Sequence, residues 1–215
     1  MNNLIRLVEG QACIVSDDPW QLDAEGDAPL ILPLALVACS NPEATGRYLI
    51  DKPSLSKTLP NRLGATELRE VSLPDYAAGQ EVAWQTADGA VRSNPDKVWA
   101  DTQPRAVTLE LARQISSVSG ATVIAEPWPL AEPADRRLEV RVEQILARAD
   151  GTFRLAGQYF VTPELGARGA DVVRRFDITV PLSSTGEADP QDPALIANAQ
   201  ASALQTLATQ IAQLL

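Results

Sequence analysis

The sequence contains no histidine, and only two cysteines occur among its 215 residues. Without histidine, the usual Ser-His and Cys-His catalytic arrangements and most zinc sites cannot form. Cys13 and Cys39 are too few for a disulfide framework, and Cys13 lies between apolar residues, as a small buried side chain would. Ser116, Ser117 and Ser119 have no histidine to activate them. We predict no catalytic residue, no metal ligand and no cofactor.

Positive charge is also scarce. Lys and Arg number 18 against 28 Asp and Glu, which gives a formal net charge of −10 at pH 7. Nucleic-acid binding needs clustered Lys and Arg to neutralise phosphates, so the composition argues against a nucleic-acid partner. Acidic residues gather at Asp17-Asp18 and within residues 23–27. Their spacing fixes no metal geometry, and we interpret both groups as solvated loop.

Long apolar runs are absent too. A membrane-spanning helix requires roughly 20 apolar residues, whereas the longest candidate here is residues 28–38. That length suits the apolar part of a signal peptide or a buried strand. The chain is long enough for one sizeable domain with a single core.

Three segments with period-two patterning follow one another between Arg137 and Leu182. Their apolar residues, segment by segment, are Leu138, Val140, Val142 and Leu146; Phe153, Leu155, Tyr159 and Val161; and Val172, Phe176, Ile178 and Val180. Such alternation is typical of strands with one buried face. Asp150-Gly151 suits a hairpin turn between the first two, and Pro181 ends the third. The pattern predicts an antiparallel meander.

A helix is predicted to cover this meander. Asp192 suits the N-cap and Pro193 the first helical position, and no Gly or Pro follows as far as Leu215. One apolar stripe recurs at three- and four-residue steps, formed by Ile196, Ala199, Ala203, Leu207, Ile211 and Leu214. We expect this stripe to pack on the sheet face that holds Val140 and Val142.

The middle of the chain alternates strands with a second helix. The segments expected to be strands are 47–51, 66–73, 81–86, 90–92 and 121–125. Asn94-Pro95 predicts a short helical turn carrying Val98 and Trp99. A second helix follows Pro104, ends at Gly120, and has an apolar face formed by Val107, Leu111, Ile115 and Val118. Residues 126–135, with three prolines around Trp128, predict a loop.

Together these elements predict an α/β (α+β) fold, with a mixed, largely antiparallel sheet and two main helices packed on it. Before this domain, Leu36-Val37-Ala38-Cys39 has the form of a lipobox, in which the Cys39 thiol accepts a diacylglycerol. A buried strand that ends in a chance cysteine would give the same four letters. We divide the chain into a signal-like segment (1–38), a polar tether (39–46) and a domain (47–215).

Several motifs beyond the lipobox resemble one known family. They are Tyr48-Leu49-Ile50, the Val71–Tyr76 segment, the Val82–Arg92 hairpin, Val98-Trp99-Ala100-Asp101, Arg137-Leu138-Glu139-Val140 and the alanine-rich terminal helix. In this order and spacing they resemble the ABC-type transport auxiliary lipoproteins, including the PqiC-like, MCE-associated members. The resemblance covers about residues 39–215.

The resemblance implies a non-enzymatic outer-membrane lipoprotein that faces the periplasm and supports membrane integrity. Its implied partners are an MCE-domain protein and the associated permease, which move lipids between the two bacterial membranes. Cys39 matches the acylated cysteine of the family, and Ser40 is not the aspartate that retains lipoproteins in the inner membrane. The resemblance also allows a homo-oligomer, whose size the sequence does not set.

The segment before the lipobox departs from this pattern, because acidic residues precede its apolar run and Arg6 is the only basic residue there. Residues 1–35 weakly resemble the start of a small cytoplasmic family associated with sulfite reduction, in which a short strand pair leads to an Asp-Trp turn. The alternatives are therefore a soluble cytoplasmic accessory protein of sulfur metabolism, or a fusion of the two kinds of sequence.

Two sets of side chains could form contact surfaces. The aromatic set, Tyr76, Trp84, Trp99, Trp128 and Tyr159, could contact lipid or a partner, but we interpret it as packing within the core and at its edge. The basic set, Arg136-Arg137 and Arg174-Arg175, could bind phospholipid head groups, but a solvated strand face is the more ordinary interpretation.

Overall fold

The structure is a computed structural model that describes residues 3–8, 11–16, 45–50, 59–164, 169–183 and 189–213. The chain divides into two compact units, residues 1–43 and 44–215. In the first unit, β1 (Asn3–Val8) pairs antiparallel with β2 (Gln11–Ser16), and Arg6 lies opposite Cys13. These strands occupy the short apolar clusters of the N-terminal sequence.

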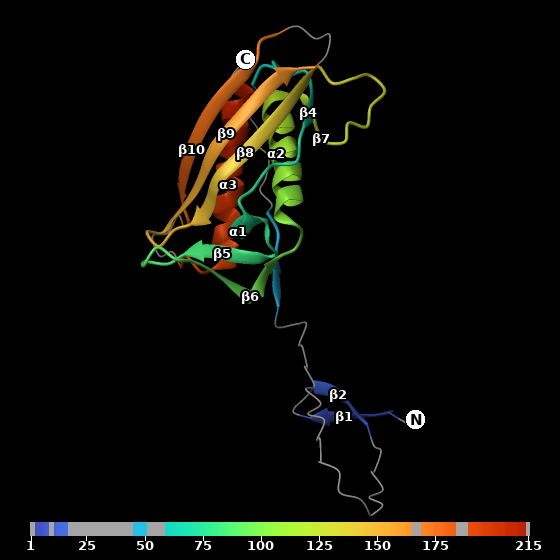
Figure 1. Cartoon of the computed structure of the whole chain (residues 1–215), viewed down its shortest axis with the longest axis vertical. Coiled ribbons are helices and arrows are strands. Elements are labelled where there is room, and N and C mark those ends of the chain that lie inside the picture. Colours follow the sequence, from blue (N-terminus) through green and yellow to red (C-terminus); the bar gives the residue numbers. More distant parts are fainter. Residues whose placement is uncertain are drawn as a thin grey trace, which may run out of the picture. The chain divides into compact units, whose positions relative to one another are not determined.

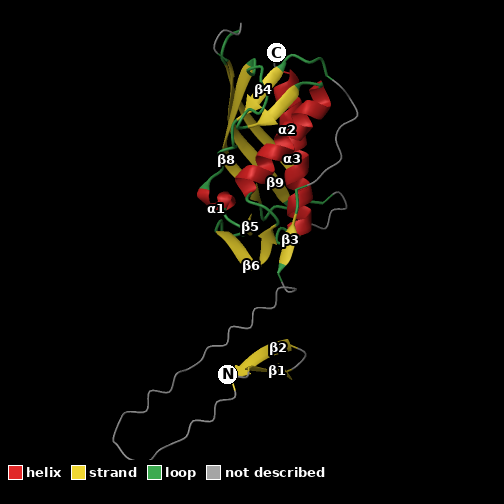
Figure 2. Ribbon diagram, turned by 90° about the vertical axis from the view of Figure 1, so that its right-hand side faces the viewer, coloured by secondary structure: helices red, strands yellow, loops and turns green. Residues whose placement is uncertain are grey.

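The second unit contains a mixed sheet with helices on one face (Figures 1 and 2). Along its main path the sheet has the order β10-β9-β8-β5-β6-β3, and β4 branches off to pair with both β7 and β8. The strands are β3 (Gly46–Tyr48), β4 (Ala65–Leu68), β5 (Glu81–Gln85), β6 (Val91–Trp99), β7 (Thr122–Ala125), β8 (Arg136–Ala147), β9 (Thr152–Pro163) and β10 (Val172–Pro181). The helices are α1 (Asp75–Ala78), α2 (Gln103–Ser119) and α3 (Pro193–Gln213). This architecture confirms the predicted α+β fold class.

The predicted meander is confirmed, because β8, β9 and β10 pair antiparallel in chain order. One detail is wrong: Leu146 is only half-buried, and Ile145 and Ala147 face the core instead. The cause is a register shift between Val142 and Gln144, since a β-bulge adds a residue and reverses which side chains face inward. The alternation in β9 and β10 holds as predicted.

Both predicted helices are confirmed. The Asp192 carboxylate accepts a hydrogen bond from the Ala194 N–H at 2.8 Å, as an N-cap does. The described part of the stripe on α3 is buried and consists of Ile196, Ala199, Ala203, Leu207 and Ile211. Helix α3 contacts β9, β10 and α2, and its core cluster includes Val140 and Val142, as predicted.

A buried polar contact joins the two helices inside this core. The side-chain amide of Gln200 on α3 donates to the amide oxygen of Gln103 on α2 at 2.8 Å, and both residues are buried. Helix α2 ends where Gly120 adopts the left-handed conformation with φ 69° and donates its N–H to the Ser116 carbonyl. Gly120 therefore closes α2 as predicted.

The predicted helical turn at Asn94-Pro95 is wrong, because residues 91–99 belong to β6. The Asn94 side chain accepts a hydrogen bond from the Asp96 N–H at 2.8 Å, which forms a local turn rather than a helix start. The β5–β6 register shifts here, since Glu81 lies opposite Val98 whereas Ala83 lies opposite Ser93. Pro95 falls within this irregular part of the ladder, where no donor is required.

The predicted strand 66–73 is shorter than expected, since β4 ends at Leu68. Beyond it the backbone is held by single hydrogen bonds to different neighbours. The Arg69 N–H donates to the Leu138 carbonyl at 2.9 Å, and the Val71 N–H donates to the Thr108 hydroxyl oxygen on α2 at 2.8 Å. Further along, Ser72 forms an isolated parallel bridge with Arg141 of β8: the Ser72 N–H donates to the Val140 carbonyl at 3.1 Å, and the Val142 N–H donates to the Ser72 carbonyl at 2.8 Å.

Candidate functional site

The proposed lipidation site, Cys39, lies outside the described residues, as do the rest of the lipobox and the acidic groups at 17–18 and 23–27. The described domain begins close behind it, with β3 at Gly46. The described residues from 45 onward therefore belong to the domain that follows the proposed tether.

The domain has two distinct ends, related through the long strand β8 (Figures 1 and 2). At the carboxyl end of β8, Ala147 lies opposite Trp84 of β5, and β5 leads through β6 to β3. At the amino end of β8, Arg136 lies opposite Thr66 of β4, and β4 pairs with β7. Residues 126–135 connect β7 to β8 at this second end, so the loop lies away from β3.

The loop of residues 126–135 is fixed by hydrogen bonds of its own. The Trp128 indole Nε1–H donates to the Glu132 carbonyl at 2.7 Å, which closes the loop upon itself. The Trp128 backbone N–H donates to Glu67 Oε1 of β4 at 2.9 Å. At the far end, the Asp135 N–H donates to the Ala65 carbonyl at 2.7 Å. We call residues 126–135 the clamped loop.

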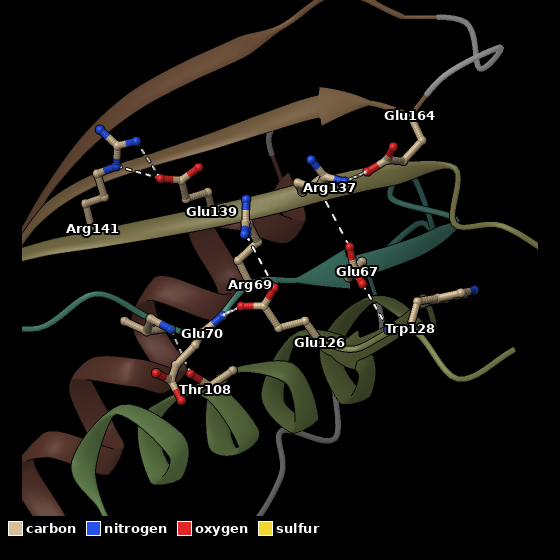
Figure 3. A network of polar contacts seen from close by, with 11 residues as sticks. Glu67, Arg69, Glu70, Thr108, Glu126, Trp128, Arg137, Glu139, Arg141 and Glu164 are labelled. Carbon is tan, nitrogen blue, oxygen red and sulfur yellow. Dashed lines mark hydrogen bonds and ion pairs between the residues drawn. The ribbon is translucent and has the colours of Figure 1, made fainter.

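A network of charged side chains supports the clamped loop from beneath (Figure 3). The Glu126 carboxylate accepts a hydrogen bond from the Glu70 N–H at 2.8 Å and forms an ion pair with Arg69 at 3.4 Å. Arg137 of β8 pairs with Glu164 at 2.8 Å. The loop and the start of β8 are thereby tied to β4 and to the end of β9.

The contact between Arg137 and Glu67 is an ion pair rather than a hydrogen bond. Arg137 Nε lies 3.7 Å from Glu67 Oε2, which exceeds hydrogen-bond length, and Nε is buried without a hydrogen-bond partner. Two glutamates therefore surround the charge of Arg137. Arg174 and Arg175 are exposed on β10, and β9 separates them from Arg136 and Arg137 on β8. The structure does not gather the four arginines into one patch.

Most of the aromatic set belongs to the core, as we interpreted it. Trp84, Trp99 and Tyr159 are buried, and Tyr159 stacks on Phe176 with ring centroids 6.3 Å apart. Burial raises the pKa of Tyr159 to about 12, although the charge of Arg174 opposes this shift. Tyr76 is half-buried and accepts a hydrogen bond from the Ile145 N–H at 3.2 Å. Of the five residues in the aromatic set, only Trp128 lies in the clamped loop.

The serines near the end of α2 make structural contacts. The Ser119 hydroxyl donates to the Ile115 carbonyl at 2.6 Å and accepts from the Ala121 N–H at 3.1 Å. Ser116 accepts a hydrogen bond from the Val123 N–H at 3.2 Å. Within the described ranges, no three acidic, cysteine or histidine side chains are grouped to hold a metal ion. No described helix is long and apolar enough to cross a membrane.

Two open grooves lie on the domain surface. The larger, of about 540 Å³, lies along the β5–β6 hairpin and is lined by residues that include Tyr76, Gln80, Val91, Arg92 and Pro95. The smaller, of about 340 Å³, lies beside the clamped loop and is lined by Glu70, Arg105, Thr108, Leu109, Ala125 and Glu126. Both grooves are open to solvent.

The described domain thus combines a mixed sheet, helices on one of its faces and a surface loop held by polar contacts. Residues 48–212 match the family described as the ABC-type transport auxiliary lipoprotein component. This match spans most of the chain, and the protein therefore belongs to that family.

Solved structures share this fold. A crystal structure of an uncharacterized protein matches with a TM-score of 0.61 and 19% identity, over 79% of this chain and 97% of that chain. A protein from Xanthomonas campestris matches with a TM-score of 0.55 and 15% identity, over 74% of this chain and 89% of that chain. At these identities the likeness shows the fold alone. No curated protein matches the chain.

Proposed function

We propose that this chain is a non-enzymatic component of an MCE-type ABC system that transports lipids between the two bacterial membranes. Residues 47–215 form an adaptor domain, which residues 39–46 tether to a lipid on Cys39. The lipid holds the protein in the outer membrane, and the domain faces the periplasm. Its partners are an MCE-domain protein and the associated permease.

One observation carries the proposal: the family match covers residues 48–212 and begins just behind a lipobox that ends at Cys39. A match to an auxiliary lipoprotein and a cysteine suited to acylation are independent features of the chain, and they occur in the order that a lipoprotein requires. The short polar stretch between them leaves the domain near the membrane surface.

The chemistry of the anchor supports this arrangement. Ala38 is small enough to let a signal peptidase reach the bond before Cys39, whose thiol becomes the acylated atom. A single acyl chain gives only marginal membrane binding, and stable attachment takes more than one chain. Several acyl chains on Cys39 would therefore anchor a chain in which no described helix can span the membrane.

Affinity capture tests the proposed partners. The full chain, tagged at its carboxyl end, is purified in detergent from cells that express the transport system, beside an unrelated tagged lipoprotein as control. We expect an MCE-domain protein and its permease to be retained with this chain alone. Retention of neither would contradict the proposal, and recovery of cytoplasmic enzymes of sulfur metabolism would favour the alternative function.

A further inference from the structure

We propose that the clamped loop, residues 126–135, is the docking element through which this domain binds a protein subunit of its transport system. Leu130 inserts into an apolar socket on that subunit, and the exposed Glu132 beside it faces a basic rim. This inference rests on the proposed function, to which it adds the surface used and the chemistry of the partner.

The loop is organised before any partner binds. Pro127, Pro129 and Pro133 restrict their backbone φ angles, and the indole of Trp128 donates to the Glu132 carbonyl at 2.7 Å. Ordering a surface loop on association costs free energy, and a loop that is already fixed avoids most of that cost. The contacts within this loop are those expected of a rigid recognition element.

The charged network that supports the loop also holds it in place before any partner binds. Glu126 holds the start of the loop through the Glu70 N–H and Arg69, and Glu67 holds its middle through the Trp128 N–H. Glu67 is itself mostly buried and paired with Arg137. A mostly buried carboxylate such as that of Glu67 needs such partners, and here they connect the loop to β4 and β8.

The rigid loop presents apolar surface to solvent. Leu130 is 51% exposed, and its neighbours Pro129 and Ala131 are exposed as well. A leucine held out of the core by a fixed loop gains free energy only when another surface covers it. Val173 is equally exposed, at 51%, but it lies on the regular strand β10 beside Arg174 and Arg175. Leu49, at 69%, is more exposed than either, so exposure alone does not single out Leu130, whereas its place in the hydrogen-bonded clamped loop does.

The charge of Glu132 indicates which residues the partner carries at the edge of its apolar socket. Glu132 is exposed, and its carboxylate makes no ion pair within the described part of the chain. Residues 39–215 contain 17 Lys and Arg against 22 Asp and Glu, so the proposed mature chain is also acidic, and a basic surface on the partner would be attracted over a longer range. An apolar socket with Lys or Arg at its edge matches both Leu130 and Glu132.

The position of the loop favours a protein over the anchoring membrane. If Cys39 is acylated, the seven residues from there to Gly46 span at most about 25 Å, so β3 lies near the membrane. Strand β8, with 12 residues and a length of about 40 Å, separates the β3 end from the loop. With β8 directed away from that membrane, the loop would reach toward the other components of the system.

Site-specific photocrosslinking tests the inference. A photoreactive residue replaces Leu130 in one variant and Val173 in a matched control, and both are irradiated in cells that express the transport system. We expect position 130 to give an adduct that contains a subunit of the ABC system, at a yield at least about tenfold above position 173. Equal yields, an adduct with lipid, or an adduct with a second copy of this chain would overturn the inference.

Affinity capture with substituted chains gives a second readout. Leu130→Asp should reduce the retained subunit about tenfold, whereas Val173→Asp should leave it unchanged, and equal melting temperatures would show that both variants are folded. Capture that Leu130→Asp does not reduce would overturn the docking role while leaving the proposed function intact. If the wild-type chain retains no MCE-domain protein, the proposed partner is wrong, and the crosslink at position 130 still decides whether the loop binds another subunit.

Discussion

Gly157 of β9 lies opposite Val142 of β8, beside the bulge, where the structure leaves no room for a side chain. A Cβ atom added at Gly157 would lie 2.2 Å from the Arg141 carbonyl oxygen and 3.0 Å from the Phe176 ring. The first neighbour is backbone and cannot rotate away. Any side chain here would therefore push two paired strands apart.

Gly157→Ala should lower the free energy of unfolding by about 1–3 kcal/mol or more, as overpacking of a close-packed interior does. Gly79→Ala is the matched control, because nothing lies within 4 Å of its added Cβ and its φ is −68°. Urea unfolding of both variants checks this prediction. Equal midpoints would show that β8 and β9 are not as close as described.

Ionisation of the Tyr159 phenol makes the stability of the folded protein depend on pH in the alkaline range. Burial raises the pKa of its phenol from 10 to about 12, so the folded protein retains this proton where the unfolded chain loses it. The contribution of the protonated Tyr159 phenol to the free energy of unfolding is fully present below pH 10. It is lost as the pH rises from about 10 to about 12. Tyr159→Phe should therefore reduce the loss of stability in this window, measured by urea unfolding at several pH values. An unchanged pH profile would contradict the assigned burial.

At the scale of elements, α3 stabilises the meander through its buried stripe. Leu207 is fully buried at the centre of that stripe, whereas Gln210 one turn further is exposed. Leu207→Ala should cost about 2–5 kcal/mol of unfolding free energy. Gln210→Ala should change it by less than about 0.5 kcal/mol. Similar effects of the two substitutions in chemical denaturation would contradict the packing of α3.

The rigidity of the clamped loop makes a separate prediction. Trp128→Phe keeps an aromatic ring but removes the Nε1–H that bonds to the Glu132 carbonyl. Amide hydrogen exchange within residues 126–135 should then become faster, while exchange in β9 stays the same. Leu130→Ala serves as the control, since it removes exposed surface without removing a described hydrogen bond. Equal exchange in wild type and Trp128→Phe would show that this bond does not hold the loop.

The elements that could be predicted from the sequence are those that the residues of the segment itself determine. The strands β8 to β10 and the helices α2 and α3 follow from periodicity and from caps such as Asp192 and Gly120. The bulge after Val142 could not be predicted, because it depends on how β8 registers with β9. At Asn94-Pro95 the sequence resembles a helix start, but pairing with β3 and β5 determines the structure instead.

The clamped loop, too, could be predicted only in part from the sequence. Its three prolines and Trp128 predict a loop, yet they do not predict that the loop is rigid. The residues that hold it are distant in sequence, since Glu67 contacts Trp128 and Arg137, and Glu126 contacts Arg69 and Glu70. Such pairs arise from strand pairing, which a single sequence does not reveal. The exposure of Leu130 depends on the same tertiary contacts.

At the scale of the whole molecule, the described domain has one end that follows the proposed tether and one end that presents the clamped loop. The first end consists of β3 with β5 and β6, and the loop end consists of β4 and β7 with the start of β8. This arrangement suits an adaptor that is attached to one envelope component and contacts another. The proposed adaptor role depends on the attachment at Cys39.

Membrane fractionation combined with intact-mass analysis tests that claim most directly. Wild type, Cys39→Ser and the control Cys13→Ser are compared in cells that process lipoproteins. We predict that wild type and Cys13→Ser are found in the outer membrane as acylated chains that begin at Cys39. The two chains should be identical, because residue 13 lies in the segment that is removed. Cys39→Ser should lose the acyl mass and leave that fraction with its domain still folded. A wild-type chain that keeps residues 1–38, or a Cys39→Ser chain that stays in the outer membrane, would contradict the account.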